Sequence, residues 1–205
     1  PGTGVDIYSH DAGIDVSGGE SGDVRYDVQE ESNMWLHLGC ALAGFLTLRT
    51  GPATLFIAKQ YTFYRTFTWQ LILLYASLFD RFYLTKPLTS RPTNSEIYLI
   101  GVGFRGCPAH ISEVMRRRLQ TRDSSPFIPE TTARLMPAIG ALRTFARNVY
   151  GQQRDMLLEI VRLHHTYTAE QITAGTRELK RQLIARWLMK HPVKRIEPAA
   201  RVPSN

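Results

Sequence analysis

Three charged side chains lie next to apolar stretches of the sequence and could form one reaction site. Asp11 follows a short apolar run, Lys59 lies near the end of a second run, and Glu96 directly precedes a third. They are separated by 48 and 37 residues, about one strand–helix unit each. A lysine between two carboxylates is either a structural ion pair or a catalytic group. Position alone leaves both interpretations open, and the structural ion pair is the commoner.

A sheet is needed to bring these charges together, and the apolar pattern predicts one. The expected strands are residues 5–9, 53–61, 81–87 and 97–104, and the expected helices between them are residues 29–49 and 66–79. This alternation indicates an α/β fold with a mostly parallel sheet covered on both faces. The last two strands are joined by about nine residues, which is too short for a parallel crossover. We therefore expect them to pair antiparallel at the edge of the sheet.

The second half of the chain has a helical pattern only. Apolar residues recur there at helical spacing, and helices are expected near residues 130–150, 152–165 and 168–190. The composition therefore predicts two parts. Residues 1–106 would contain the sheet, and residues 107–205 would form an all-α basic domain.

The net charge of +7 is divided unevenly along the 205 residues. Residues 1–100 hold 7 Lys+Arg and 10 Asp+Glu, whereas residues 101–205 hold 18 Lys+Arg and 8 Asp+Glu. A less basic part beside a strongly basic one is typical of proteins that bind a polyanion such as RNA, DNA or a membrane surface. Solubility alone would tolerate the same division, so the charge does not decide between these interpretations.

Short motifs around the three charges resemble one family. The sequence contains DIYSHDAG at residues 6–13, FIAK at residues 56–59 and KPLTSRPTNSEIYL at residues 86–99. In that order they resemble the FtsJ/RrmJ-like ribose 2′-O-methyltransferases, whose catalytic tetrad is Lys-Asp-Lys-Glu. Asp11, Lys59 and Glu96 match the Asp, the second Lys and the Glu. The resemblance implies the C-terminal half of a Rossmann-like methyltransferase sheet that uses S-adenosylmethionine.

The resemblance is incomplete at its beginning. The family's glycine-rich loop and its first catalytic lysine lie upstream of the Asp, and only ten residues precede Asp11 here. Lys59 between two carboxylates would stay protonated, because a nearby cation lowers the pKa of a lysine whereas carboxylates raise it. We therefore expect these 205 residues alone to be inactive and to need an upstream segment.

The resemblance also implies an RNA substrate and a larger protein. A domain of this family followed by basic helices is similar to the C-terminal end of the large polymerase proteins of nonsegmented negative-strand RNA viruses, or to other viral capping proteins. The substrate would be capped RNA, methylated on the ribose 2′-hydroxyl alone or on guanine N7 as well, in the host cytoplasm or the virion. The residues expected to contact RNA are Ser90, Arg91, Arg116, Arg117, Arg118, Lys180 and Arg181.

The alternatives stay open at this point. The basic residues could instead form solvated helix faces, and the whole chain could be a non-catalytic RNA-binding or scaffold module with a degenerate methyltransferase fold. Cys40 and Cys107 are too few for a disulfide-dense or Cys-rich zinc protein. The histidines lack partners at ligand spacing, so no metal is expected. The longest apolar stretch, residues 67–79, is too short to span a bilayer, and no membrane partner is expected.

Overall fold

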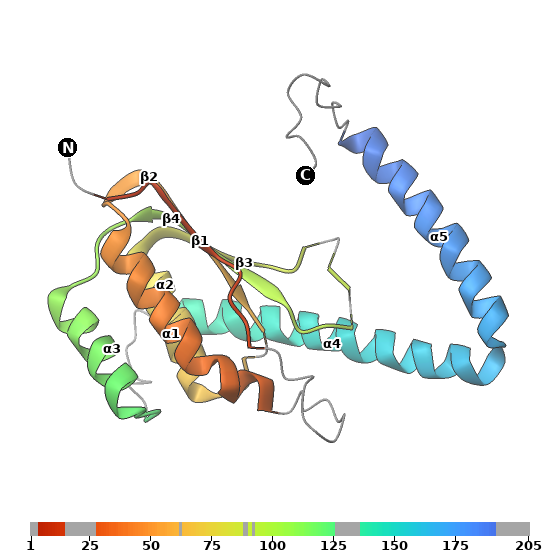
Figure 1. Cartoon of the computed structure of the whole chain (residues 1–205), viewed down its shortest axis with the longest axis horizontal. Helices are drawn as coiled ribbons and strands as arrows, with labels where there is room; N and C mark the ends of the chain where they lie inside the picture. Colours follow the sequence, from red (N-terminus) through yellow and green to blue (C-terminus); the bar gives the residue numbers. More distant parts are fainter. Residues whose placement is uncertain are drawn as a thin grey trace, which may run out of the picture. The chain divides into compact units, whose positions relative to one another are not determined.

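The computed structural model describes residues 4–14, 28–61, 63–87, 90–91, 93–125 and 136–191 (Figure 1). Four strands form a sheet in the order β1–β2–β4–β3. Their bounds are Ile7–His10 for β1, Gly51–Gln60 for β2, Phe79–Thr85 for β3 and Ile97–Phe104 for β4. Strands and helices alternate up to β3, β4 follows directly, and the predicted α/β class is confirmed.

The pairing of the strands differs from the prediction in one respect. β1 and β2 run parallel, whereas β4 is antiparallel to both of its neighbours, β2 and β3. The antiparallel pairing of the last two strands, with β3 at the edge, is confirmed. Strands β1, β2 and β3 run in the same direction, as expected of a mostly parallel sheet, and β4 alone among the described strands runs against them, because the chain turns back after β3 and inserts β4 beside β2. The positions of apolar runs along the sequence do not show which strand lies between two others in the sheet.

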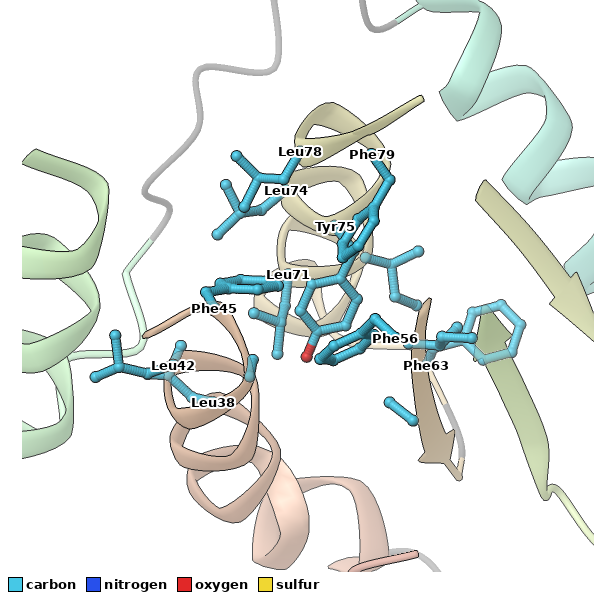
Figure 2. Packing of buried hydrophobic residues seen from close by; sticks show 14 of the residues in the cluster. Leu38, Leu42, Phe45, Phe56, Phe63, Leu71, Leu74, Tyr75, Leu78 and Phe79 are labelled. Atoms are coloured by element: carbon cyan, nitrogen blue, oxygen red, sulfur yellow. The ribbon is translucent and has the colours of Figure 1, made fainter. Parts of the chain in front are cut away.

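Helices α1 (Gln29–Thr47) and α2 (Thr66–Leu78) pack on one face of this sheet. Figure 2 shows side chains of both helices gathered around Phe56 of β2, which is fully buried. The Phe56 ring centroid lies 5.6 Å from that of Phe45 in α1 and 5.4 Å from that of Tyr75 in α2. Aromatic contacts at these distances join both helices to the strand that carries Lys59.

The opposite face of the sheet carries apolar side chains that remain partly exposed. The strand registers place Ile7, Ile57 and Tyr83 together on that face. Ile7 is 61% exposed and Tyr83 is 49% exposed. The expected cover on both faces is therefore not found among the residues that the structure describes.

Two further helices contribute to the same core. Met115 of α3 (Ala109–Thr121) and Leu142 and Val149 of α4 (Met136–Thr166) are buried in one cluster with side chains of α1 and α2. Their apolar sides, rather than the basic charge of this part of the chain, decide where these helices pack.

The chain divides by its contacts into Pro1–Arg154 and Asp155–Asn205. α3 and the first part of α4 pack with α1 and α2 in the first of these units, and the domain boundary expected after residue 106 stays a prediction. A break in α4 was expected near Gly151, and the structure has one continuous helix there. A glycine costs a helix interior roughly 1 kcal/mol relative to alanine, which does not end a helix by itself. The expected helical start at residues 130–135 lies outside the described residues.

Helix α5 (Ala169–Lys190) confirms the helix expected near residues 168–190. It begins with a capping box, in which the Gln171 N–H donates to the Thr168 hydroxyl and the Thr168 N–H donates to the Gln171 side chain. Large apolar side chains on it, including Leu183 and Trp187, remain exposed. Within the described part of the chain, no helix has the length and hydrophobicity needed to cross a membrane.

Candidate active site

The ends of β1 and β2 bring Asp11 and Lys59 together. His10, the last residue of β1, pairs in parallel register with Ala58, so Asp11 follows at the level of Lys59. Asp11 Oδ1 lies 2.8 Å from Lys59 Nζ. The Lys59 side chain is 10% exposed and that of Asp11 is 73% exposed. A nearly buried ammonium therefore meets an exposed carboxylate at the end of the sheet where β1 and β2 finish, which is called the sheet edge below.

The Asp11–Lys59 pair keeps both groups ionised. Burial alone would lower the pKa of Lys59, but hydrogen bonds with Asp11 and Tyr61 outweigh it and raise this pKa above its usual value. The hydrogen bond from Lys59 in turn lowers the pKa of Asp11. An ammonium of this kind donates hydrogen bonds well and is a weak general base at neutral pH.

Tyr61 packs between Lys59 and the segment that follows Asp11. The Lys59 Nζ atom lies 5.2 Å from the centroid of the Tyr61 ring, where the ring attracts a cation. A Cβ atom on Gly13 would lie 2.7 Å from Tyr61 Cε2, which is closer than real Cβ atoms approach. Gly13 therefore allows the chain after Asp11 to lie against the ring.

Strand β4 brings Glu96 to the same edge. Tyr98 pairs with Lys59 in the antiparallel register, and Glu96 comes just before β4. The Tyr98 hydroxyl donates to Asp11 Oδ1 at 3.4 Å. Burial, and then the charges of Glu96 and Asp11, raise the pKa of this hydroxyl, and a hydrogen bond with Glu96 adds to the effect. Tyr98 thus lies between the two carboxylates. It belongs to the motif of residues 86–99, but no role was predicted for it from the sequence.

A buried histidine lies behind this edge. His37 of α1 is 2% exposed, and its ring stacks on that of Tyr61 with centroids 6.5 Å apart. Burial, and then the charge of nearby His10, lower the pKa of His37 to about 4, although hydrogen bonds with the Ala12 backbone and the Gln60 side chain act the other way. His37 therefore stays neutral at neutral pH. The available sequence signal was a lone histidine in an amphipathic helix, which is not specific.

The turn between β3 and β4 carries two of the predicted RNA contacts. The Ser90 hydroxyl donates to Asn94 Oδ1 at 3.0 Å and accepts from Lys86 Nζ at 3.3 Å, so it is bonded within the turn. Arg91 is exposed. Of these two predicted residues, Arg91 is the one whose polar group faces solvent.

The three consecutive arginines of α3 have different surroundings. Arg116 and Arg117 are exposed, whereas Arg118 is 7% exposed. The Arg118 guanidinium donates to the backbone carbonyls of Asp123, at 2.9 Å, and Ser125. Successive residues of a helix point about 100° apart, so three in a row cannot share one face. The prediction that Arg118 faces an RNA is wrong, and its bonds hold the segment after α3.

The remaining predicted contacts lie on α5. Lys180 and Arg181 are exposed, and Arg181 forms an ion pair with Glu178 one turn away, at 2.8 Å. Within the residues that the structure describes, no cluster of three or more His, Cys, Asp or Glu side chains could hold a metal ion.

Comparison with known proteins gives this site a context. A model of the FtsJ-like methyltransferase family matches residues 2–104. The probable methyltransferase EP424R of African swine fever virus is 37% identical over 127 residues, which cover 62% of this chain and 28% of that protein. The cap-specific mRNA (nucleoside-2′-O-)-methyltransferase 1 of Xenopus laevis is 37% identical over 102 residues, 50% of this chain and 11% of that protein. The Bos taurus protein of the same name is 35% identical over 102 residues.

Proposed function

The chain belongs to the FtsJ-like methyltransferase family, and we propose that it methylates the ribose 2′-hydroxyl of a capped RNA with S-adenosylmethionine as donor. The observation that carries the proposal is the Asp11–Lys59 pair at the sheet edge where Glu96 precedes β4, inside the matched segment. The 37% identity with a protein named for 2′-O-methylation of mRNA supports the choice of acceptor.

Lys59 would hold the acceptor hydroxyl. Its ammonium is anchored by Asp11, backed by the Tyr61 ring and largely screened from water. A fixed hydrogen-bond donor there would orient the ribose oxygen and stabilise the negative charge that develops on it, without reorganisation during the reaction. Since the pKa of Lys59 is raised, the proposal gives it a steering role rather than that of a base. The hydroxyl proton would pass to water as the bond between oxygen and the methyl carbon forms and the bond between sulfur and that carbon breaks, which leaves a neutral thioether.

The chemistry of this edge fits a sulfonium donor. Asp11 presents an open carboxylate next to Lys59, and Glu96 adds a second acidic group. When bound, S-adenosylmethionine supplies an electrophilic methyl group on a positively charged sulfur. Asp11 and Glu96 would attract that charge, and Tyr98 between them would hold the carboxylates in place.

The RNA would be held mainly through its phosphates. Arg91, Arg117 and Lys180 are exposed cations that could neutralise phosphates without reading sequence. This chain spans 28% of the viral relative and 11% of the Xenopus relative, so the activity of a whole protein is also part of the proposal. A setting in a larger viral polymerase or capping protein, in the host cytoplasm or virion, stays a prediction from the motifs.

The rival function is a non-catalytic RNA-binding or scaffold module. It would keep the Asp11–Lys59 pair as a structural ion pair and would not bind the donor. It predicts RNA binding that weakens steeply with salt, with no dependence on S-adenosylmethionine.

Product mapping separates the two functions. The intact protein is incubated with donor labelled in the methyl group and three RNAs: a capped RNA, the same RNA with 2′-deoxyribose at its first nucleotide, and the same RNA without a cap. We expect label on the first ribose of the capped RNA and none on the deoxy substrate. Label on guanine alone would contradict the ribose acceptor, and RNA binding without donor binding would favour the rival.

A further inference from the structure

Lys86, just after β3, lies in a cage of oxygen atoms. Its Nζ atom donates to Asn94 Oδ1 at 2.8 Å, to the Asn94 carbonyl at 2.9 Å, to the Glu96 carbonyl at 3.0 Å and to the Ser90 hydroxyl at 3.3 Å. Two of these oxygens belong to the backbone. One of the two backbone oxygens is that of Glu96 itself.

We propose that Lys86 is a positioning residue, whose caged ammonium fixes the turn before β4 and thereby places Glu96 opposite the Asp11–Lys59 pair. The proposal rests on the function proposed above and deepens it. Lys86 lies outside the three residues matched to the catalytic tetrad. It acts through the backbone of Glu96 and has no contact with Asp11 or Lys59 in the described hydrogen bonds and ion pairs.

The cage requires a cation. Carbonyl, amide and hydroxyl oxygens converge on one point, and their partial negative charges repel one another unless a cation lies between them. A charged donor makes stronger hydrogen bonds to such oxygens than a neutral one does. Burial lowers the pKa of Lys86 below its usual value, although the negative charge of Glu96 acts the other way. The carboxylate that Lys86 positions therefore also favours its charged form.

A second bond reaches the same turn from α4. Gln153 Nε2 donates to the Thr93 carbonyl at 2.9 Å. This bond is neutral and reaches the turn one residue before Asn94. It provides a matched comparison, because Gln153→Ala removes one bond to the turn and leaves the charged cage complete.

The test uses the intact protein with Lys86→Met, which keeps most of the length of the side chain and removes its charge, and with Lys86→Ala. Hydrogen exchange of the backbone amides of residues 93–98 reports on the turn without any assay of activity. We expect exchange there to become about 10- to 100-fold faster in both variants, the factor that corresponds to a lost charged hydrogen bond. Amides of β2 serve as the internal reference for folding.

Chemical rescue identifies the role of the charge. Propylammonium replaces the atoms that Lys86→Ala removes, and we expect it to slow the exchange of residues 93–98 again, whereas 1-propanol should not. In methyl transfer to capped RNA, we expect kcat to fall about 10-fold or more with KM for the RNA nearly unchanged, and propylammonium to restore part of it. Gln153→Ala should show a smaller effect that propylammonium does not change.

Two results would overturn the proposal. One is exchange in Lys86→Met as slow as in the unaltered protein. The other is a loss of methyl transfer in Lys86→Ala that propylammonium and 1-propanol restore equally, because packing rather than charge would then be responsible. Absence of methyl transfer by the unaltered protein, assayed together with the upstream segment that these residues are expected to need, would instead contradict the proposed function, and the exchange measurement would still decide whether the ammonium holds the turn.

Discussion

The charges at the sheet edge and the charges along α5 are paired in different ways. Asp11 and Lys59 are 48 residues apart in sequence and meet only because two parallel strands lie side by side. On α5, Arg181 and Glu178 are three residues apart and meet on the surface of one helix. The first pair depends on the complete fold, whereas the second forms in any helix. Charges whose arrangement requires the fold are therefore the better candidates for chemistry.

The largest difference between the sheet and α5 is expected for substitutions of their apolar residues, measured as the loss in free energy of unfolding. Phe56→Ala empties a fully buried site in β2 and should lower the free energy of unfolding by about 3–5 kcal/mol. Trp187→Ala on α5 should cost less than about 1 kcal/mol, because that side chain is 45% exposed. Urea denaturation followed by circular dichroism measures both. Equal losses would show that α5 is packed as tightly as the sheet.

The second largest difference is expected in the pH dependence of stability, between the buried His37 and an exposed histidine. The pKa of His37 is lowered to about 4, so between that value and the usual 6.5 or so the unfolded chain binds a proton that the folded chain does not. Stability should therefore rise with pH across this range, by up to about 3 kcal/mol from this group. His37→Gln should remove that part of the slope, and His164→Gln, at an exposed position of α4, is the control for the loss of a histidine. A slope that is the same in all three proteins would contradict the account of His37.

The two neighbouring arginines of α3 offer a smaller and sharper contrast. Arg118→Ala leaves the carbonyls of Asp123 and Ser125 without their charged donor and should lower stability by about 1–3 kcal/mol. Arg117→Ala should change stability by no more than about 0.5 kcal/mol, because the side chain is exposed. Arg117→Ala should weaken RNA binding more than Arg118→Ala does. Thermal unfolding measures the effect on stability, and filter binding at two salt concentrations measures the effect on RNA affinity. If Arg117→Ala lowered stability more and Arg118→Ala weakened RNA binding more, the roles given to the two residues would be incorrect.

The smallest effect is expected for the surface pair of α5. Arg181→Ala removes an exposed ion pair with Glu178, which should be worth about 0.2–1 kcal/mol and less at high salt. If this helix contacts RNA phosphates, the same substitution should reduce the slope of log affinity against log salt by up to about one unit. Melting curves in low and high salt and a salt titration of RNA binding check the two parts. An unchanged salt slope would remove Arg181 from the RNA-binding residues.

The sequence predicted local structure better than arrangement. Strand and helix positions follow from apolar periodicity, and most ends agree with the structure within about two residues. The inserted strand β4 and the continuity of α4 through Gly151 were missed, because both depend on tertiary packing that no local pattern records.

The same distinction holds at the site. The order of the three motifs identified Asp11, Lys59 and Glu96, because each of these residues lies in a specific sequence context. Tyr98 and His37 were missed, since their roles arise from strand register and from burial behind the sheet edge. Arg118 was assigned to RNA from its place in a triplet of arginines, and the helical rotation between successive residues turns it inward.

The central claim is that Lys59 acts on the acceptor hydroxyl rather than serving as an ordinary ion pair. The most direct measurement is the rate of methyl transfer to a capped RNA by the intact protein with Lys59→Ala, compared with Lys180→Ala, with RNA affinity measured in parallel. The account predicts that Lys59→Ala lowers kcat by about 10²- to 10⁴-fold with RNA affinity nearly unchanged, and that Lys180→Ala affects affinity only. Methyl transfer that continues at the original rate without Lys59, in a protein that remains folded, would contradict it.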